Sequence, residues 1–293
     1  MRRNTKNTAI AFALMAAVFY GINTPFSKLL LNYVEPTFMA SFLYLGAGIG
    51  VGVMYFFHIG KEDKAERLTK KDLPYTIAMI ILDIAAPIFL MLGIRTGCAS
   101  NASLLGNFEI VATTMIAVLF FKEKVSIKLW IAIGLITASS IVLSFEGIEC
   151  FKFSLGSLFV IIATCCWGLE NNCTRKISNR STYEIVTIKG LFSGAGAFVT
   201  AVIIGESIPM VKYIAYVLVL GFVAYGLSIF LYVRAQRDLK AAKTSAYYAI
   251  APFIGTFLAF IINNEEFTLV YFIGLVLMLI GSSLVVYDTL TKE

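Results

Sequence analysis

The sequence predicts an all-α integral membrane protein with ten transmembrane helices, arranged as two inverted five-helix repeats. Of its 293 residues, 59% are hydrophobic and only 14% are charged, and the mean hydropathy is +0.83. A soluble globule of this size needs more polar residues than that to cover its surface. The apolar residues also fall into segments about as long as a membrane-crossing helix, and the two halves of the chain share a sequence pattern.

Ten apolar segments approach the roughly 20 residues that a helix needs to cross the hydrocarbon core. The expected spans are residues 8–31, 36–57, 73–94, 98–121, 127–146, 154–174, 183–205, 212–233, 243–263 and 270–287. The connections between them are too short for an extramembrane domain. The first span has cations before it but no small-residue cleavage site after it, so we expect it to be retained as a helix rather than removed as a signal peptide.

The repeat is first visible in a polar stretch that follows an aromatic-glycine pair within an apolar span. The first copy runs from Tyr20 to Lys28, and the second runs from Trp167 to Arg175, 147 positions later. In both copies a cation stands seven residues after the glycine. The organisation of the whole chain depends on this duplication.

A longer match extends the repeat at an offset of 142 residues. The run 95–110, followed by Glu123, aligns without a gap with the run 237–252, followed by Glu265. The predicted halves are therefore residues 1–146 and 147–293. Because each half holds five spans, an odd number, the second half must lie upside down relative to the first. Inverted repeats of this kind are typical of secondary transporters, which bind substrate between the halves near the midplane.

The distribution of cations between the two sides predicts the orientation. Nineteen Lys and Arg residues fall on the side of the termini and three on the other, and short cytoplasmic loops accumulate such residues. We therefore expect a multi-pass protein of the plasma membrane with both termini in the cytoplasm. The net charge of +6 is explained by these loops and not by a basic face for nucleic acid, so no nucleic-acid partner is expected.

Four charged side chains stand clearly inside predicted spans, namely Asp83, Glu109, Glu170 and Lys189. Such residues are costly in a membrane and usually face a cavity or a partner. Glu170 and Lys189 lie nine and ten residues from the same hairpin turn, which puts both at a depth of about 14 Å and predicts that they pair. Whether this pair is structural or takes part in binding or coupling is left open by the sequence.

Asp83 and Glu109 lie at similar depths on either side of another turn, with no cation predicted beside them. Two carboxylates in a low dielectric repel one another and resist ionising, so at least one is expected to exchange protons near neutral pH. Glu109 is the expected coupling residue because it immediately precedes the position where the second half has Pro252. The alternative is that one acid is protonated and hydrogen-bonded within a helix interface.

Uncharged polar and aromatic residues complete the predicted site. Asn23 and Asn171 follow the two aromatic-glycine pairs, and Tyr20, Trp167 and Tyr248 stand in spans that could line a cavity. Aromatic rings combined with carboxylates favour a cation or a zwitterion, held by cation-π contact and charge.

These motifs resemble the drug/metabolite transporter superfamily, and within it the ten-span EamA-type carriers. The resemblance covers nearly the whole chain and rests on the two aromatic-glycine pairs, the run from Arg237 to Ser245, and Pro252 with Glu265. It implies a 5+5 carrier with a central cavity lined mainly by spans 1, 3, 4, 6, 8 and 9. The first half has Ile110 where the proline falls, which weakens the expectation of a bend in the fourth span.

The sequence therefore predicts a secondary active transporter of a small polar metabolite, such as an amino acid or amine, that is proton-coupled or an exchanger and works by alternating access. An uncoupled facilitator or channel, and a carrier of sugars or nucleotide sugars, remain alternatives. Enzyme motifs are missing from the sequence, so an enzyme is not expected, and neither is a cofactor or a metal. The five cysteines are expected to be reduced core residues. The expected partners are the substrate and the lipid bilayer, with a homodimer left open.

Overall fold

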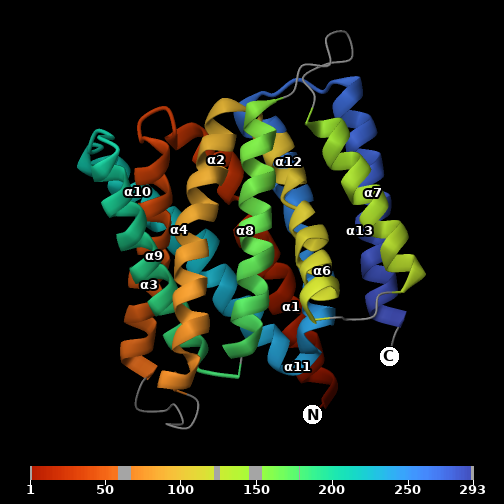
Figure 1. The fold of residues 1–293 in the computed structure, drawn as a ribbon, viewed down its shortest axis with the longest axis horizontal. Helices are drawn as coiled ribbons and strands as arrows, with labels where there is room; N and C mark the ends of the chain where they lie inside the picture. Colours follow the sequence, from red (N-terminus) through yellow and green to blue (C-terminus); the bar gives the residue numbers. More distant parts are fainter. Residues whose placement is uncertain (1, 59–66, 122–125, 145–153, 178, 292–293) are drawn as a thin grey trace.

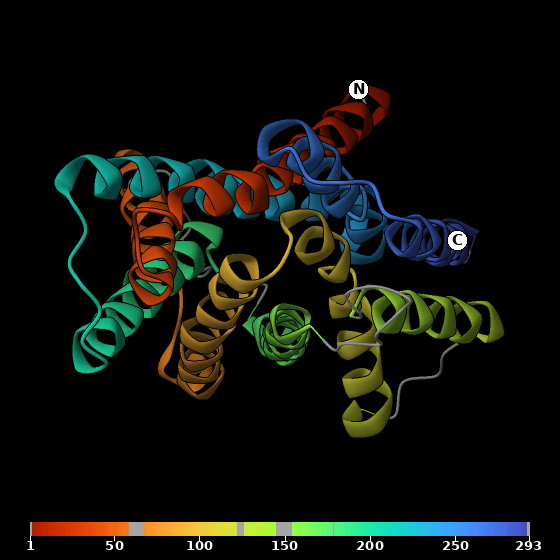
Figure 2. The same ribbon diagram turned by 90° about the horizontal axis from the view of Figure 1, so that it is seen from above.

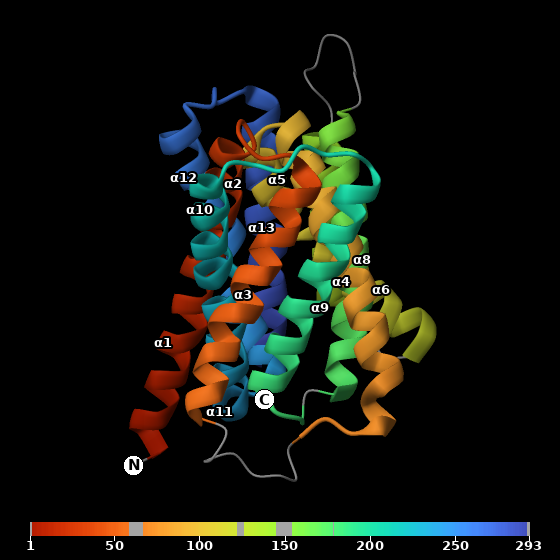
Figure 3. The ribbon, with the colours of Figure 1, turned by 90° about the vertical axis from the view of Figure 1, so that its left-hand side faces the viewer.

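The computed structural model describes residues 2–58, 67–121, 126–144, 154–177 and 179–291, and within these ranges every regular element is helical. The helices form one bundle, and both ends of the chain lie at its lower side in Figures 1 and 3. We call this side the termini end and the opposite side the distal end.

The first half supplies five spans, two of which are broken into two helices. Its elements are α1 (Arg2–Gly21), α2 (Asn23–Leu30), α3 (Pro36–His58), the short 3-10 helix η3 (Lys70–Asp72), α4 (Leu73–Thr96), α5 (Ala99–Leu105), α6 (Phe108–Phe121) and α7 (Ile127–Leu143).

The second half repeats this plan. Its elements are α8 (Leu155–Ile177), α9 (Thr182–Ile203), α10 (Val211–Gly221), the π-helical segment η4 (Phe222–Leu227), α11 (Ser228–Tyr248), α12 (Ala251–Asn263) and α13 (Leu269–Thr291).

The ten expected spans can all be assigned to these elements. In the described part of the chain, seven helical segments are long and apolar enough to cross a membrane, and α7 and α12 are shorter apolar helices. The remaining span is α8, which has 23 residues but carries Glu170, Arg175 and Lys176.

Spans 8 and 9 are both present although α11 covers the connection between them. Ser228 Oγ lies 3.3 Å from the hydroxyl of Tyr248, and the Tyr232 and Tyr248 rings are 5.0 Å apart. A straight helix would separate residues twenty positions apart by about 30 Å. The chain therefore reverses its direction within α11, as the two-span prediction requires.

The fourth and ninth spans break at matching positions. The first break lies at Gly106 and Asn107, and the second at Ala249 and Ile250, so an offset of 142 places Asn107 on Ala249. Span 4 therefore breaks as span 9 does, although Ile110 stands where the second half has Pro252. There the backbone N–H groups of Asn107, Glu109 and Ile110 bond to carbonyls three residues earlier, a tightening that interrupts the α-helix without a proline.

The two halves run in opposite directions through the bundle. α1 begins at the termini end, whereas α8 begins at the distal end, where the N–H of Ser154 donates to the carbonyl of Ser144 at the end of α7 (2.7 Å). The boundary expected after residue 146 falls in 145–153, outside the described residues. The same is true of Glu123 and of the side chain of Arg237.

Contacts between equivalent helices relate the halves. α3 packs along α9, α7 along α13, and α5 along α12, and each pair joins a span to its own counterpart five spans later. Figure 3 shows α3 beside α9, and Figure 2 shows α7 and α13 together at the margin of the bundle. This pairing is the pattern that a two-fold relation between two five-span halves produces.

Two glycines make one of the close contacts between the two halves. A Cβ atom at Gly48 would lie within 3.0 Å of the backbone of Gly190, and one at Gly190 would lie 2.4 Å from the Cα of Gly48. These glycines are 142 positions apart, so each is the repeat equivalent of the other. Small residues let membrane helices pack at this distance, and the pair lies at the centre of the relation between the halves.

At the distal end, the corner between α4 and α5 is held from two sides by opposite charges. The Lys28 ammonium donates to the carbonyls of Ile94 (2.7 Å) and Gly97 (2.6 Å), which end α4. The Glu265 carboxylate accepts from the backbone N–H groups of Ala99 (2.6 Å) and Ser100 (2.9 Å), which begin α5. Each charge thus compensates the helix terminus of opposite partial charge.

We predict that Glu265→Gln lowers the free energy of unfolding by about 1 to 2 kcal/mol, because two charge-assisted hydrogen bonds to helix N–H groups are weakened. Glu266→Gln removes the same charge from the neighbouring exposed position and is the matched control. Thermal unfolding of the detergent-purified variants provides the comparison. Equal stability of the two variants would show that the corner does not depend on Glu265.

Candidate functional site

The centre of the site is an ion triple, which we call the ionic cluster, made of Asp83, Glu170 and Lys189. The Lys189 ammonium lies 3.0 Å from Asp83 Oδ2 and 3.1 Å from Glu170 Oε1. The three residues come from α4, α8 and α9, and their exposed fractions are 0%, 2% and 8%. The predicted pairing of Glu170 with Lys189 is confirmed.

Hydroxyl groups complete the coordination of the two carboxylates. Tyr44 of α3 donates its O–H to Asp83 Oδ1 (2.9 Å) and accepts a hydrogen bond from Trp167 Nε1 (3.4 Å). Thr174 donates to Glu170 one helical turn away. One ammonium therefore faces two carboxylates, and neutral donors stabilise the remaining negative charge.

The expectation that no cation lies beside Asp83 is wrong. α9 packs against α4 and brings Lys189 to Asp83, whereas α8 packs between α4 and α6, the helix of Glu109. Distance from a hairpin turn fixes the depth of a residue but neither the direction it faces nor the helix it meets. Asp83 therefore shares its site with Glu170, and its expected pairing with Glu109 is not observed.

Glu109 instead lies beside a neutral amide. Asn171 Nδ2 of α8 donates to Glu109 Oε1 at 2.6 Å, and the Glu109 side chain is partly exposed. Among the described residues, no Lys or Arg forms an ion pair with it. Its carboxylate lies within electrostatic range of three tyrosines, Tyr20 of α1, Tyr225 of η4 and Tyr248 at the end of α11.

A second group, which we call the tyrosine half-site, consists of Tyr20, Asn23, Tyr225 and Tyr248. The Tyr20 ring centroid is 5.9 Å from that of Tyr225 and 5.8 Å from that of Tyr248. Asn23, which is buried, donates from Nδ2 to the Tyr225 hydroxyl (3.3 Å). The Tyr44 and Tyr225 rings are 5.1 Å apart and join this group to the ionic cluster.

Six of the nine predicted site residues belong to these two groups. Trp167 contacts the ionic cluster through Tyr44, and Glu109 and Asn171 form a hydrogen bond with each other. Tyr44 and Tyr225 were recognisable only as aromatic residues within spans. The sequence repeat could have identified Tyr225 as a site residue, because the offset of 142 aligns it with Asp83. Tyr225 also lies in η4, and π-helical segments within α-helices are frequent at functional sites.

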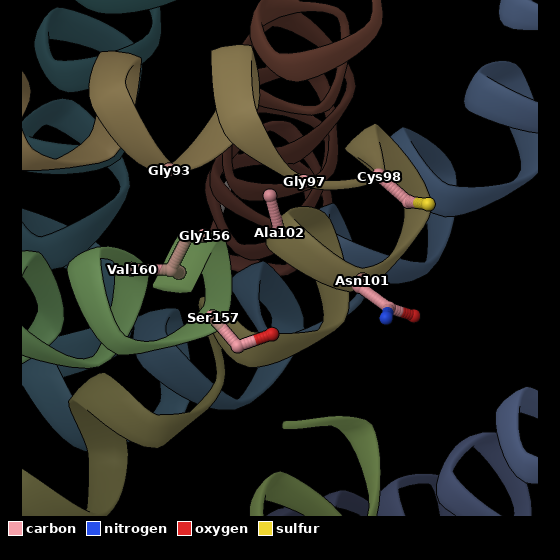
Figure 4. Close-up of a pocket in the computed structure, with 8 residues that line it drawn as sticks. All are labelled: Gly93, Gly97, Cys98, Asn101, Ala102, Gly156, Ser157 and Val160. Atoms are coloured by element: carbon pink, nitrogen blue, oxygen red, sulfur yellow. The ribbon is translucent and has the colours of Figure 1, made fainter. Parts of the chain in front are cut away.

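A crevice at the distal end, between α4, α5 and α8, is not part of this site (Figure 4). It is too narrow for a water molecule, and Gly93, Gly97 and Gly156 line it where the helix backbones approach closely. We interpret it as a packing seam.

The four cysteines that the structure describes do not form disulfides, but none of them is fully buried, so the expectation that they are core residues is wrong for these four. Cys98 and Cys165 are exposed, and Cys166 and Cys173 are half-buried. The outer surface of a membrane bundle faces lipid, so a small apolar side chain has no reason to turn inward. Among the described residues, no three His, Cys, Asp or Glu side chains are grouped to hold a metal ion.

We predict that Lys189→Met destabilises the protein by about 3 to 5 kcal/mol, because it leaves two buried carboxylates without their cation. The triple variant Asp83→Asn, Glu170→Gln, Lys189→Met removes all three charges and should recover most of the folded yield. Lys212→Met, at an exposed lysine over the Tyr213 ring, is the control. Yield of monodisperse protein and thermal unfolding are the measurements, and a Lys189→Met variant as stable as the control would contradict an ion triple.

Comparison with solved structures supports the fold. A protein titled "Crystal structure of protein" superposes with a TM-score of 0.68, covering 94% of both chains at 14% sequence identity.

Two relatives of similar length are both named uncharacterized transporters. One, from Methanothermobacter thermautotrophicus, is 25% identical over 92% of this chain and 83% of its own. The other, from Clostridium kluyveri, is 24% identical over 92% and 90% respectively. A third relative, uncharacterized protein MJ1333.1 of Methanocaldococcus jannaschii, is 30% identical over 48% of this chain and 99% of its own, so it has about the length of one half.

The family model of the EamA-like transporters matches twice, over residues 7–145 and 154–287. Each match covers one five-span half, in agreement with the repeat seen in sequence and structure. This family and the two full-length relatives are transporters and not enzymes. The chain is a multi-pass membrane protein and belongs to the EamA-like transporter family.

Proposed function

We propose that the protein is a secondary active transporter that exchanges a small cationic or zwitterionic amine for a proton. The observation that carries the proposal is the charge balance of the site. Asp83, Glu109 and Glu170 supply three carboxylates, and among the residues that the structure describes only the Lys189 ammonium forms an ion pair with any of them. An interior with excess negative charge favours cations and opposes anionic substrates such as nucleotide sugars.

The excess of carboxylates in the site also supports coupling of transport to protons. An uncompensated carboxylate at membrane depth is costly, so it is stabilised either by a proton or by a bound cation. Glu109, with a neutral amide as its partner, is the acid best placed to alternate between the two. When the substrate cation arrives, the O–H bond of the carboxyl group breaks, the proton passes to water, and the carboxylate pairs with the cation without any transfer of electrons.

The inverted repeat supplies the alternating access that such exchange requires. The site lies between the halves, close to the Gly48 and Gly190 contact, so rocking of one half against the other would expose it to each side in turn. Both groups of site residues come from one chain, so the mechanism needs no second copy. An open channel is disfavoured because the site consists of single charges and not of rings.

The cation distribution supports a plasma-membrane orientation with the termini end in the cytoplasm. In a cysteine-free background, a cysteine introduced at Glu266 should react with an impermeant thiol reagent added to intact cells. One introduced at Asn179 should react only after permeabilisation, since it lies in the exposed α8–α9 turn of the opposite end. Labelling of residue 179 in intact cells would reverse the orientation.

The substrate class is tested by thermal stabilisation of the purified protein with amino acids, polyamines, quaternary amines and sugars, because a ligand that binds only the folded form stabilises it. Amines should stabilise the protein and sugars should not.

We predict that the best amine of that panel releases protons when it is added to wild-type protein in weak buffer, and that Glu109→Gln abolishes the release. Glu109→Gln should also lose uptake driven by a pH gradient in vesicles. Glu266→Gln, outside the site, should behave like the wild type in both assays. Full pH-driven uptake by Glu109→Gln would make Glu109 a structural acid and end the coupling proposal.

A further inference from the structure

The repeat relates the ionic cluster to the tyrosine half-site residue by residue. The offset of 147 that aligns Gly21 with Gly168 places Asn23 on Glu170. The offset of 142 that aligns Gly48 with Gly190 places Tyr225 on Asp83. The two residues that converge in the second group are therefore equivalents of the two carboxylates that converge in the first.

The structure reproduces this relation in space. Asp83 of α4 and Glu170 of α8 meet at a common ammonium, and their equivalents meet directly, since Asn23 of α2 donates to the Tyr225 hydroxyl of η4 at 3.3 Å. α4 packs against α8, and α1, which leads into α2, packs against η4. The two groups thus occupy equivalent places in the two halves.

One component of the ionic cluster has no counterpart in the first half. The offset of 142 places Lys189 on Ala47, which is buried and carries no charge. The second half therefore provides its own ammonium, tethered to α9, and the first half does not. Among the described residues, none supplies a cation at the equivalent position in the tyrosine half-site.

The groups that face this position suit an ammonium from outside. The centroid of the Tyr20 ring lies within 6 Å of the centroids of the Tyr225 and Tyr248 rings, and aromatic faces attract cations. Glu109 of α6 lies within electrostatic range of all three rings and provides the negative charge. Among the described residues, the other charged groups that act on Glu109 are Glu170 and Lys189, which already pair with each other.

We infer that the tyrosine half-site binds the primary ammonium group of the substrate, in the place equivalent to the one that the Lys189 ammonium fills in the ionic cluster. The inference rests on the proposed function and narrows it from cations in general to primary amines. Hydroxyl and amide oxygens are present beside the rings at Tyr225, Tyr248 and Asn23, and Ser228 lies 3.3 Å from the Tyr248 hydroxyl. Such acceptors form hydrogen bonds with the N–H donors of a primary ammonium, and a quaternary ammonium has no N–H donor.

The probe is n-butylammonium, which has the four carbons and the terminal ammonium of a lysine side chain. Its comparison ligands are n-butyltrimethylammonium, which keeps the charge without N–H donors, and 1-butanol, which has no charge. Binding to detergent-purified protein is measured by titration calorimetry and by thermal stabilisation. Wild-type protein should bind n-butylammonium more tightly than n-butyltrimethylammonium, and should not bind 1-butanol.

Tyr225→Leu should weaken n-butylammonium binding about tenfold or more, because it removes the ring and the hydroxyl. Tyr225→Phe keeps the ring, so it should lose less affinity but narrow the preference for n-butylammonium over n-butyltrimethylammonium. Tyr33→Leu, at an exposed tyrosine stacked on Tyr213 at the distal end, is the control and should bind like the wild type. If Tyr225→Leu does not fold, Tyr225→Phe and the comparison of the two cations still test the half-site assignment.

Two failures are distinguishable. Wild-type protein that binds neither cation contradicts the proposed function, and the half-site assignment falls with it. The half-site assignment is overturned if Tyr225→Leu binds n-butylammonium as tightly as the wild type does. It is also overturned if the wild type and Tyr225→Phe each bind both cations with equal affinity. In either case the proposal of a cation transporter still stands.

Discussion

The structure depends on one constraint, that charge inside a membrane must be compensated. Lys189 satisfies it for Asp83 and Glu170 by bringing α4, α8 and α9 to one point. Because α4 belongs to the first half and the other two helices to the second, the ion triple also links the two halves. Removing any one of the three charges changes both the stability of the bundle and the charge that a ligand meets.

The same constraint gives the two halves different roles. Duplication supplies two equivalent positions near the contact between Gly48 and Gly190, and divergence has made one ionic and the other aromatic. The ionic position is filled by a residue of the chain. The aromatic position has rings, acceptors and the neighbouring Glu109, which is the combination that favours a cation supplied from outside.

Much of this could be predicted from the sequence. Hydropathy located ten spans, since a helix in lipid must be apolar over a fixed length, and two offsets revealed the repeat. Depth along a hairpin was enough to pair Glu170 with Lys189, because both lie on adjacent spans of one hairpin. It failed for Asp83, whose partner lies four spans away, because depth says nothing about which helices are neighbours. The break at Asn107 could be expected only weakly from the sequence, since it arises from backbone hydrogen bonds and not from a proline. Exposure of Cys165 was missed because hydrophobicity cannot separate a core face from a lipid face.

Exchange of a substrate cation for a proton requires a carboxyl group of the site to give up its proton when the cation binds. Infrared difference spectroscopy of the purified protein, with and without n-butylammonium, reports this directly through the carbonyl stretch of protonated carboxylic acids. Binding should remove such a band and add a carboxylate band, and both changes should disappear in Glu109→Gln. Binding of the amine with no loss of a protonated carboxyl band, or with the same loss in Glu109→Gln, would contradict it.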